Sequence, residues 1–106
     1  MIRKSAVIGA GVMGSGIALH LASAGCEVVL IDNDTTQLSR ARITITDSSV
    51  RFSNDLSDSV HADYVIEAIS EDLGIKKRLF RALSNVVPTA TIIASITSSL
   101  IIRDLA

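Results

Sequence analysis

The chain has 106 residues and a formal net charge of −1, and 48% of its residues are hydrophobic while 20% are charged. These values indicate one globular domain and exclude a disordered chain. Because the charge is near neutral and the basic residues are spread out, the surface lacks the basic patch that nucleic acids or anionic membranes bind.

The first half of the chain predicts two parallel strands joined by a helix. Residues 4–9 and 27–32 are short apolar runs rich in Val and Ile, and the segment between them has the length of a helix. At 100° per residue, one face of helix 12–24 is apolar and small and should pack on the sheet. This face consists of Met13, Gly14, Ile17, Ala18, Leu21, Ala22 and Ala24.

The second half continues the alternation of strands and helices. We expect strands over 50–54, 63–69 and 90–96, with a turn over 54–59. The expected helices run from Thr35 to about Ile43, from Asp72 to Val87 before Pro88, and from Ser98 or Ser99 to Leu105. In the second of these helices the apolar side consists of Leu73, Ile75, Leu79, Phe80, Ala82, Leu83, Val86 and Val87. Such alternation predicts an α/β fold with a mostly parallel sheet and helices on both faces.

A glycine motif lies between the first strand and the first helix. Gly9, Gly11 and Gly14 form the pattern G-x-G-x-x-G, which in this context predicts a Rossmann-type, doubly wound dinucleotide-binding fold. Gly9 would allow the tight turn, Gly11 the approach of a pyrophosphate, and Gly14 close helix packing. The amides at the helix start, at Val12 and Met13, would then receive the phosphate charge. The alternative is a turn that serves packing only.

Asp32 follows the second strand and predicts the choice of cofactor. A carboxylate there accepts hydrogen bonds from the ribose hydroxyls of an adenosine but repels a 2′-phosphate. Asn33 and Asp34 offer no positive charge to such a phosphate. We therefore expect NAD rather than NADP, the alternative being that Asp32 is an ordinary turn carboxylate.

Lys76 lies, by helical angle, within the apolar side of its helix, whereas Lys77, Arg78 and Arg81 form an outer, solvated face. A lysine on the core side needs water or a partner. The crevice at the carboxyl ends of the strands, where Glu71 also lies, offers one. The alternative is that the apolar stem of Lys76 is buried while its ammonium group reaches water at the helix end.

Other polar residues give weaker signals. Ser98 and Ser99 either cap the last helix or contact a ligand, because the last strand ends at the same crevice. His20 and His61 have no partner at metal-ligand spacing, so we expect no metal site. Cys26 is the only cysteine and should be a small apolar residue in a reduced compartment. Without an apolar run of about 18 residues or a signal peptide, the cytoplasm is the expected location, or the mitochondrial matrix in a eukaryote.

Three segments together resemble the amino-terminal NAD-binding domain of the L-3-hydroxyacyl-CoA dehydrogenases. They are AVIGAGVMGSGIALHLASAGCEVVLIDND, VIEAISEDLGIKKRLF and ASITSSL. Enzymes of this family oxidise the 3-hydroxyl of a fatty acyl-CoA and pass hydride to NAD. The resemblance implies that the glycines hold the pyrophosphate and Asp32 the ribose, that Glu71 and Lys76 approach the nicotinamide, and that Ser98 lies near substrate and cofactor as the one candidate catalytic residue.

The chain also departs from the family pattern. Ile96 replaces an Asn, residues 38–50 leave room for one short helix where the family has a long helical hairpin with CoA contacts, and the family's catalytic His, Glu and helical dimerising domain lie beyond the equivalent of Ala106. We therefore expect residues 1–106 to form a single NAD-binding domain with little or no activity alone, its partners being NAD, an acyl-CoA and another copy or a complementing chain. Two alternatives are a stand-alone NAD-binding or sensor module and a dehydrogenase for a small hydroxy acid.

Overall fold

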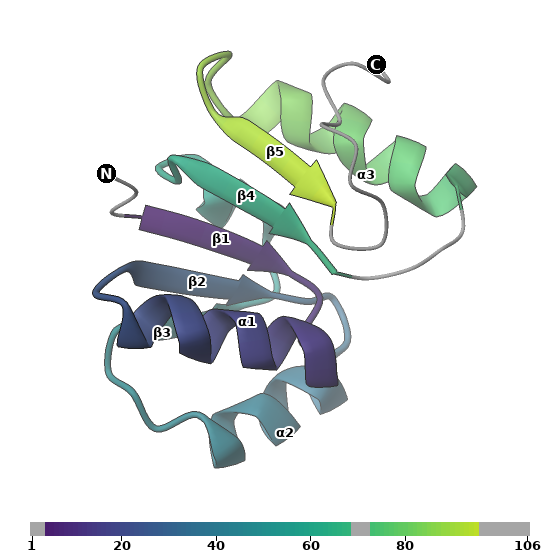
Figure 1. Ribbon diagram of the computed structural model, residues 1–106. Helices are drawn as coiled ribbons and strands as arrows, with labels where there is room; N and C mark the ends of the chain where they lie inside the picture. The colour runs from purple at the N-terminus through teal and green to yellow at the C-terminus, as the bar shows by residue number, and fades with distance from the viewer. Residues whose placement is uncertain (1–3, 69–72, 96–106) are drawn as a thin grey trace.

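Five parallel strands form one sheet in the order β3-β2-β1-β4-β5 in the computed structural model, which describes residues 4–68 and 73–95 (Figure 1). The strands are β1 (Lys4–Ile8), β2 (Glu27–Ile31), β3 (Val50–Ser53), β4 (Tyr64–Glu67) and β5 (Ile92–Ser95). The helices are α1 (Val12–Ser23), α2 (Thr35–Thr44), α3 (Leu73–Val86) and the short 3-10 helix η1 (Leu56–Ser59). The predicted α/β fold with a parallel, doubly wound sheet is confirmed.

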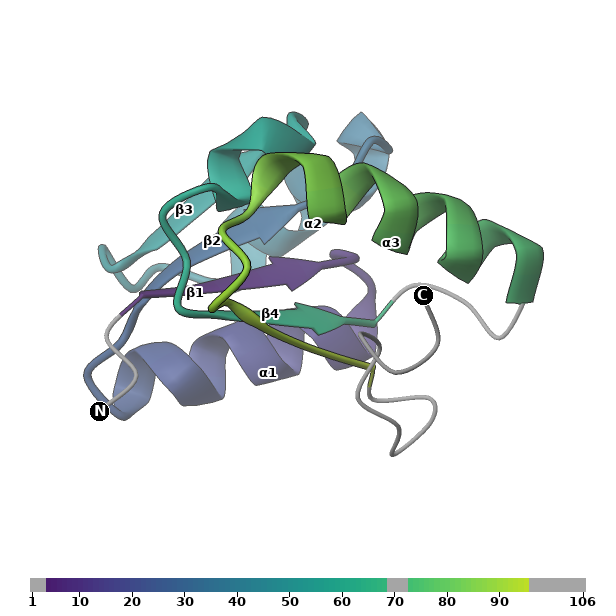
Figure 2. The same ribbon diagram turned by 90° about the horizontal axis from the view of Figure 1, so that it is seen from above.

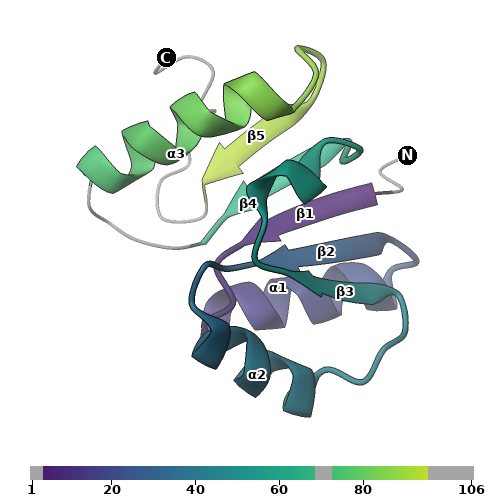
Figure 3. The ribbon, with the colours of Figure 1, turned by 180° about the vertical axis from the view of Figure 1, so that it is seen from behind.

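Helices cover both faces of the sheet, as the two hydrophobic clusters show. One cluster joins α1 and α2 to the side chains of Val7, Val28 and Leu30. The other joins α3 to Ala6, Ile8 and Val65, with Leu56 of η1 packed against it. Figures 2 and 3 show α3 and η1 on one side of the strands and α1 on the other. Because successive side chains of a strand point to opposite faces and both faces are covered, β1 and β2 are buried and mostly apolar after their first residue.

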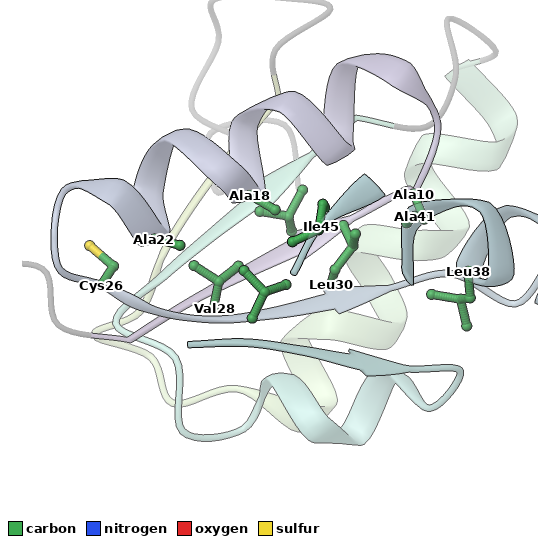
Figure 4. Close-up of a cluster of buried hydrophobic side chains, with 11 residues drawn as sticks. Ala10, Ala18, Ala22, Cys26, Val28, Leu30, Leu38, Ala41 and Ile45 are labelled. Atoms are coloured by element: carbon green, nitrogen blue, oxygen red, sulfur yellow. The ribbon is translucent and has the colours of Figure 1, made fainter. Parts of the chain in front are cut away.

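Small side chains bring α1 close to the sheet. Ala18 and Ala22 are buried against Val28 and Leu30, together with Cys26 at the turn into β2 (Figure 4). Cys26 is thus a small core residue, as predicted. Two residues assigned to this face are in fact exposed, Met13 in the first turn of α1 and Ala24 at its carboxyl end. The prediction treated α1 as lying over strands along its full length, whereas its first turn lies beside the glycine turn.

The buried side of α3 is narrower than the sequence predicts. Phe80, Leu83 and Val87 are buried and Leu79 and Val86 are partly buried, but Ile75 and Ala82 are exposed. A single helix lying on a flat sheet covers less than half of its own circumference, so the outermost residues of a 180° arc remain in solvent. Lys77, Arg78 and Arg81 are exposed, as predicted.

One short helix was not predicted from the sequence. The predicted turn at 54–59 contains η1, whose start is capped by the carboxylate of Asp55. The hydroxyl of Ser57, and then its amide, donate hydrogen bonds to this carboxylate and lower the pKa of Asp55. The helix expected from Ser98 or Ser99 to Leu105 lies outside the described residues. Within residues 4–68 and 73–95, every helix is too short or too polar to cross a membrane.

Candidate dinucleotide-binding site

The helices that follow β1 and β4 lie on opposite faces of the sheet, although the two strands are neighbours. α1, which follows β1, lies on one face, and α3, which follows β4, lies on the other (Figure 1). In open parallel sheets such a reversal leaves a crevice outside the carboxyl ends of the strands, and ligands bind there. The glycine motif follows β1 directly, so it lies at this crevice.

The turn after β1 depends on the backbone of Gly9. Its φ of 109° lies in a region that residues with a side chain rarely adopt. The amide of Gly9 still donates to the carbonyl of Ile31 at 2.7 Å, and the amide of Ala68 donates to the carbonyl of Ile8 at 2.8 Å. The chain therefore leaves the sheet between two strands that hold it on both sides.

Gly14 and Gly11 differ in what surrounds them. A Cβ atom added at Gly14 would lie 1.7 Å from the carbonyl oxygen of Gly9, so the helix can contact the turn only because this residue has no side chain. A Cβ at Gly11 would meet nothing within 4 Å. Gly14 thus serves packing, as predicted, while the space beside Gly11 is open, as an approaching pyrophosphate requires.

The amino terminus of α1 has no side-chain cap. Gly11 is its N-cap residue and makes no capping hydrogen bond with a side chain, whereas Asp34 caps α2 by accepting from the amides of Thr36 and Gln37. Val12 and Met13 in the first turn of α1 are 96% and 61% exposed. An uncapped helix start presents amide groups and a partial positive charge, which suit a phosphate.

Asp32 is half-buried and ties the glycine turn to the loop after β2. Its Oδ2 accepts from the amide of Ala10 at 2.8 Å, and its Oδ1 accepts from the amide of Asp34 at 2.9 Å. These two hydrogen bonds were not predicted from the sequence. A carboxylate has about four lone-pair sites, so each oxygen retains one for a ribose hydroxyl. Asp32 is thus fixed in place by main-chain groups and can still accept hydrogen bonds from the ribose hydroxyls.

A small cavity of about 210 Å³ opens beside Asp32 on the α3 face of the sheet. Its walls are mainly apolar, and its polar groups come from the loops after β2 and β3. The lining residues are Ile8, Ile31, Asp32, Asn33, Asn54, Leu56 and Leu79. An apolar slot with a few polar groups at its rim suits a flat heteroaromatic ring.

A larger hollow of about 380 Å³ lies at the end of the sheet where the strands begin, here called the amino edge. Its lining includes Lys4, Glu27, Arg51 and His61. Its greater volume does not make it the better candidate. The glycine turn, the uncapped helix and Asp32 all lie at the end of the sheet where the strands end, here called the carboxyl edge. Parallel sheets bind ligands at this edge. We therefore assign the candidate site to the carboxyl edge.

Lys76 is buried and forms a polar cluster with Glu67 and Ser95. Its Nζ lies 3.4 Å from Oε1 of Glu67 and donates to Oγ of Ser95 at 3.2 Å. The Ser95 hydroxyl in turn donates to Oε1 of Glu67 at 2.7 Å. Glu67 and Ser95 are the last residues of β4 and β5 and pair directly in the sheet register. The cluster therefore lies at the carboxyl edge, on the far side of β1 from Asp32.

Burying the Lys76 ammonium would cost free energy if it had no partners. A cation in the first turn of a helix opposes the helix dipole, and a buried charge is tolerated only when it is paired. Removing one member of a buried ion pair costs about 3–5 kcal/mol, whereas replacing both members by apolar groups is often neutral. Lys76 is therefore not a solvated residue at a helix end, and its partner is Glu67 at the end of β4.

Sequence reasoning identified Lys76 as unusual but did not identify Glu67. The available signal was a glutamate in the otherwise apolar run 64–68 of a strand that is covered on both faces. Glu71, the partner considered from the sequence, lies outside the described residues, as do Ser98, Ser99 and Ile96. The two histidines, His20 and His61, are both exposed. Among the described residues, no three His, Cys, Asp or Glu side chains form a group that could hold a metal ion.

Comparisons with known proteins identify the family of the chain. The family described as "3-hydroxyacyl-CoA dehydrogenase, NAD binding domain" matches residues 4–49 and 43–106. The two matched stretches overlap at residues 43–49, from the end of α2 to the residue before β3.

Individual relatives cover nearly the whole chain. A "Probable 3-hydroxybutyryl-CoA dehydrogenase" of Bacillus subtilis is 37% identical over 99% of the chain and 44% of the relative. The "5-formyl-3-hydroxy-2-methylpyridine 4-carboxylate 5-dehydrogenase" of Mesorhizobium japonicum is 37% identical over 99% of the chain and 40% of the relative. A crystal structure of the 3-hydroxyacyl-CoA dehydrogenase of Archaeoglobus fulgidus superimposes with a TM-score of 0.83 at 37% identity, over 91% of this chain and 34% of that one.

The chain spans less than half the length of each of these three proteins. The family match nevertheless covers all the described residues, including the glycine turn, Asp32 and the Lys76 cluster. The chain therefore belongs to the 3-hydroxyacyl-CoA dehydrogenase family, as its NAD-binding domain.

Proposed function

We propose that this domain holds NAD for an oxidoreductase that transfers hydride between the cofactor and the 3-hydroxyl or 3-keto group of an acyl-CoA. The observation that carries the proposal is the hydrogen bond that the amide of Ala10, in the glycine turn, donates to the carboxylate of Asp32. That bond places the open turn, the uncapped helix start and a carboxylate within one short stretch of the carboxyl edge. These are the three features that a dinucleotide with a free 2′-hydroxyl requires.

Each part of the cofactor is bound by different residues. The amides at the start of α1 hold the pyrophosphate, Asp32 accepts from the ribose hydroxyls, and the cavity beside Ile31 and Leu79 takes the adenine ring. When bound, NAD supplies the hydride acceptor and NADH the donor. The protein's part in the reaction is to bind and orient the nicotinamide half over β4 and β5.

A second candidate is a dehydrogenase for a small hydroxy acid. It is favoured by the single ten-residue helix α2 between β2 and β3, which leaves little surface for a CoA. It is also favoured by the M. japonicum relative, whose name gives a pyridine carboxylate as its substrate. We retain the acyl-CoA as first choice because the B. subtilis and A. fulgidus relatives are both named for it.

Bound NADH can report which substrate enters the site. We expect NADH to bind the chain saturably, and acetoacetyl-CoA then to change the fluorescence of the bound NADH. Acetoacetate alone should leave the fluorescence unchanged at the same concentration, since it lacks the CoA group. An effect of acetoacetate without one of acetoacetyl-CoA would replace the first proposal by the second. Failure of NADH to bind would refute both.

A further inference from the structure

The cluster of Glu67, Ser95 and Lys76 lies where the second half of a dinucleotide would be. Asp32 follows β2, the glycine turn follows β1, and Glu67 and Ser95 end β4 and β5. A dinucleotide with its adenosine at Asp32 and its pyrophosphate at the turn must extend over β4 and β5. Leu79, which lines the cavity beside Asp32, is one helical turn from Lys76 on α3.

The cluster pairs two opposite charges in a nearly water-free setting. The side chain of Glu67 is completely buried, whereas that of Lys76 retains 9% of its surface. The Ser95 hydroxyl accepts from the ammonium and donates to the carboxylate, so the three polar groups form one continuous chain. The ammonium and the carboxylate thus form a close pair of opposite charges, 3.4 Å apart.

This pairing of charges matters because the nicotinamide ring changes charge during the reaction. The ring carries one positive charge in NAD⁺ and none in NADH. An ammonium without a partner would repel the oxidised ring and so favour the reduced cofactor, whereas a lone carboxylate would do the reverse. A close pair of opposite charges leaves only a small residual field at the distance of a ligand.

We propose that Glu67 and Ser95 are positioning residues of the cofactor site, and that the Glu67 carboxylate sets the balance between bound NAD⁺ and NADH. Ser95 holds the Lys76 ammonium in a fixed geometry, and Glu67 offsets its charge. This inference rests on the proposed cofactor function. It extends that function to two residues that sequence reasoning did not select.

The test compares affinities for the two forms of the cofactor in three variants. Glu67→Gln leaves Lys76 without its carboxylate and should raise the ratio of Kd for NAD⁺ to Kd for NADH by roughly fivefold or more. Lys76→Met leaves the carboxylate and should lower the ratio by a similar factor. The double variant removes both charges and should return the ratio to about the wild-type value. Isothermal calorimetry or fluorescence titration gives each Kd.

The double variant and one control keep the result interpretable. Arg78→Met removes a cation from the exposed face of the same helix and should leave the ratio unchanged. If a single variant does not fold, as judged by its thermal unfolding curve, the double variant and the remaining single variant still give the sign. A purely structural role would weaken both cofactor forms equally, and an unchanged ratio in folded variants would overturn the inference. If the wild-type chain bound neither form, the proposed function itself would fail, and this inference with it.

Discussion

Replacing Gly14 by alanine should lower the free energy of unfolding by about 3 kcal/mol or more. The added Cβ would lie 1.7 Å from the carbonyl oxygen of Gly9, which belongs to the backbone and cannot rotate away. Either α1 moves outward and loses its contacts through Ala18 and Ala22, or the turn after β1 changes shape. Both responses displace the amides at the start of α1, so NADH binding should be lost as well. Urea unfolding followed by circular dichroism measures the first effect.

Gly16→Ala is the matched control for this change. Gly16 lies in the same helix two residues further on, and a Cβ there would meet nothing within 4 Å. Because alanine restricts the unfolded chain and favours the helix, this variant should be about 0.5–1 kcal/mol more stable than the wild type. Equal destabilisation by both substitutions would mean that the close contact between Gly14 and Gly9 does not hold α1 to the sheet.

Replacing Asp32 by asparagine should remove most of the discrimination between NADH and NADPH. A carboxylate about 4 Å from a 2′-phosphate raises the binding free energy by roughly 1–4 kcal/mol per charge pair, which corresponds to a five-fold to thousand-fold preference for NADH. The amide keeps the shape of the side chain but not its charge. Binding of NADH should weaken because the amide group accepts fewer hydrogen bonds, while binding of NADPH should weaken less because the charge repulsion is removed at the same time. The quantity to measure is therefore the ratio of the two dissociation constants.

Glu27→Gln tests whether any carboxylate near β2 would have the same influence on the preference for NADH over NADPH. Glu27 is exposed at the amino end of the strand that Asp32 follows, so the two residues lie at opposite edges of the sheet. This variant should keep the wild-type ratio. A wild-type chain that bound both cofactors equally, or a ratio that changed with Glu27 as much as with Asp32, would contradict the ribose assignment.

The features that follow from local rules were predictable. The glycine spacing between a strand and a helix placed the turn, and the small residues Ala18 and Ala22 placed the buried side of α1. Such features depend on residues within a few positions of one another and on helical or strand periodicity. The family resemblance rested on the same segments, and the comparisons confirm it.

The features that depend on tertiary placement were not predictable to the same extent. Lys76 was recognised as misplaced, but its contact with Glu67 requires α3 to lie over the end of β4, and its contact with Ser95 requires the register of β4 and β5. The exposure of Met13 and Ile75 likewise depends on where each helix lies on the sheet. Periodicity gives the angle of a residue around a helix axis, but it does not give the width of the surface that the sheet covers.

The most direct test of the account is to map where NADH binds by the change in backbone amide NMR shifts. We expect the largest changes at 9–14, at Asp32 and at the ends of β4 and β5, because the cofactor should lie across the carboxyl edge. Residues Lys4, Glu27, Arg51 and His61 at the amino edge should be nearly unaffected. Shifts concentrated at that opposite edge, with the 9–14 amides unchanged, would contradict the placement of the cofactor.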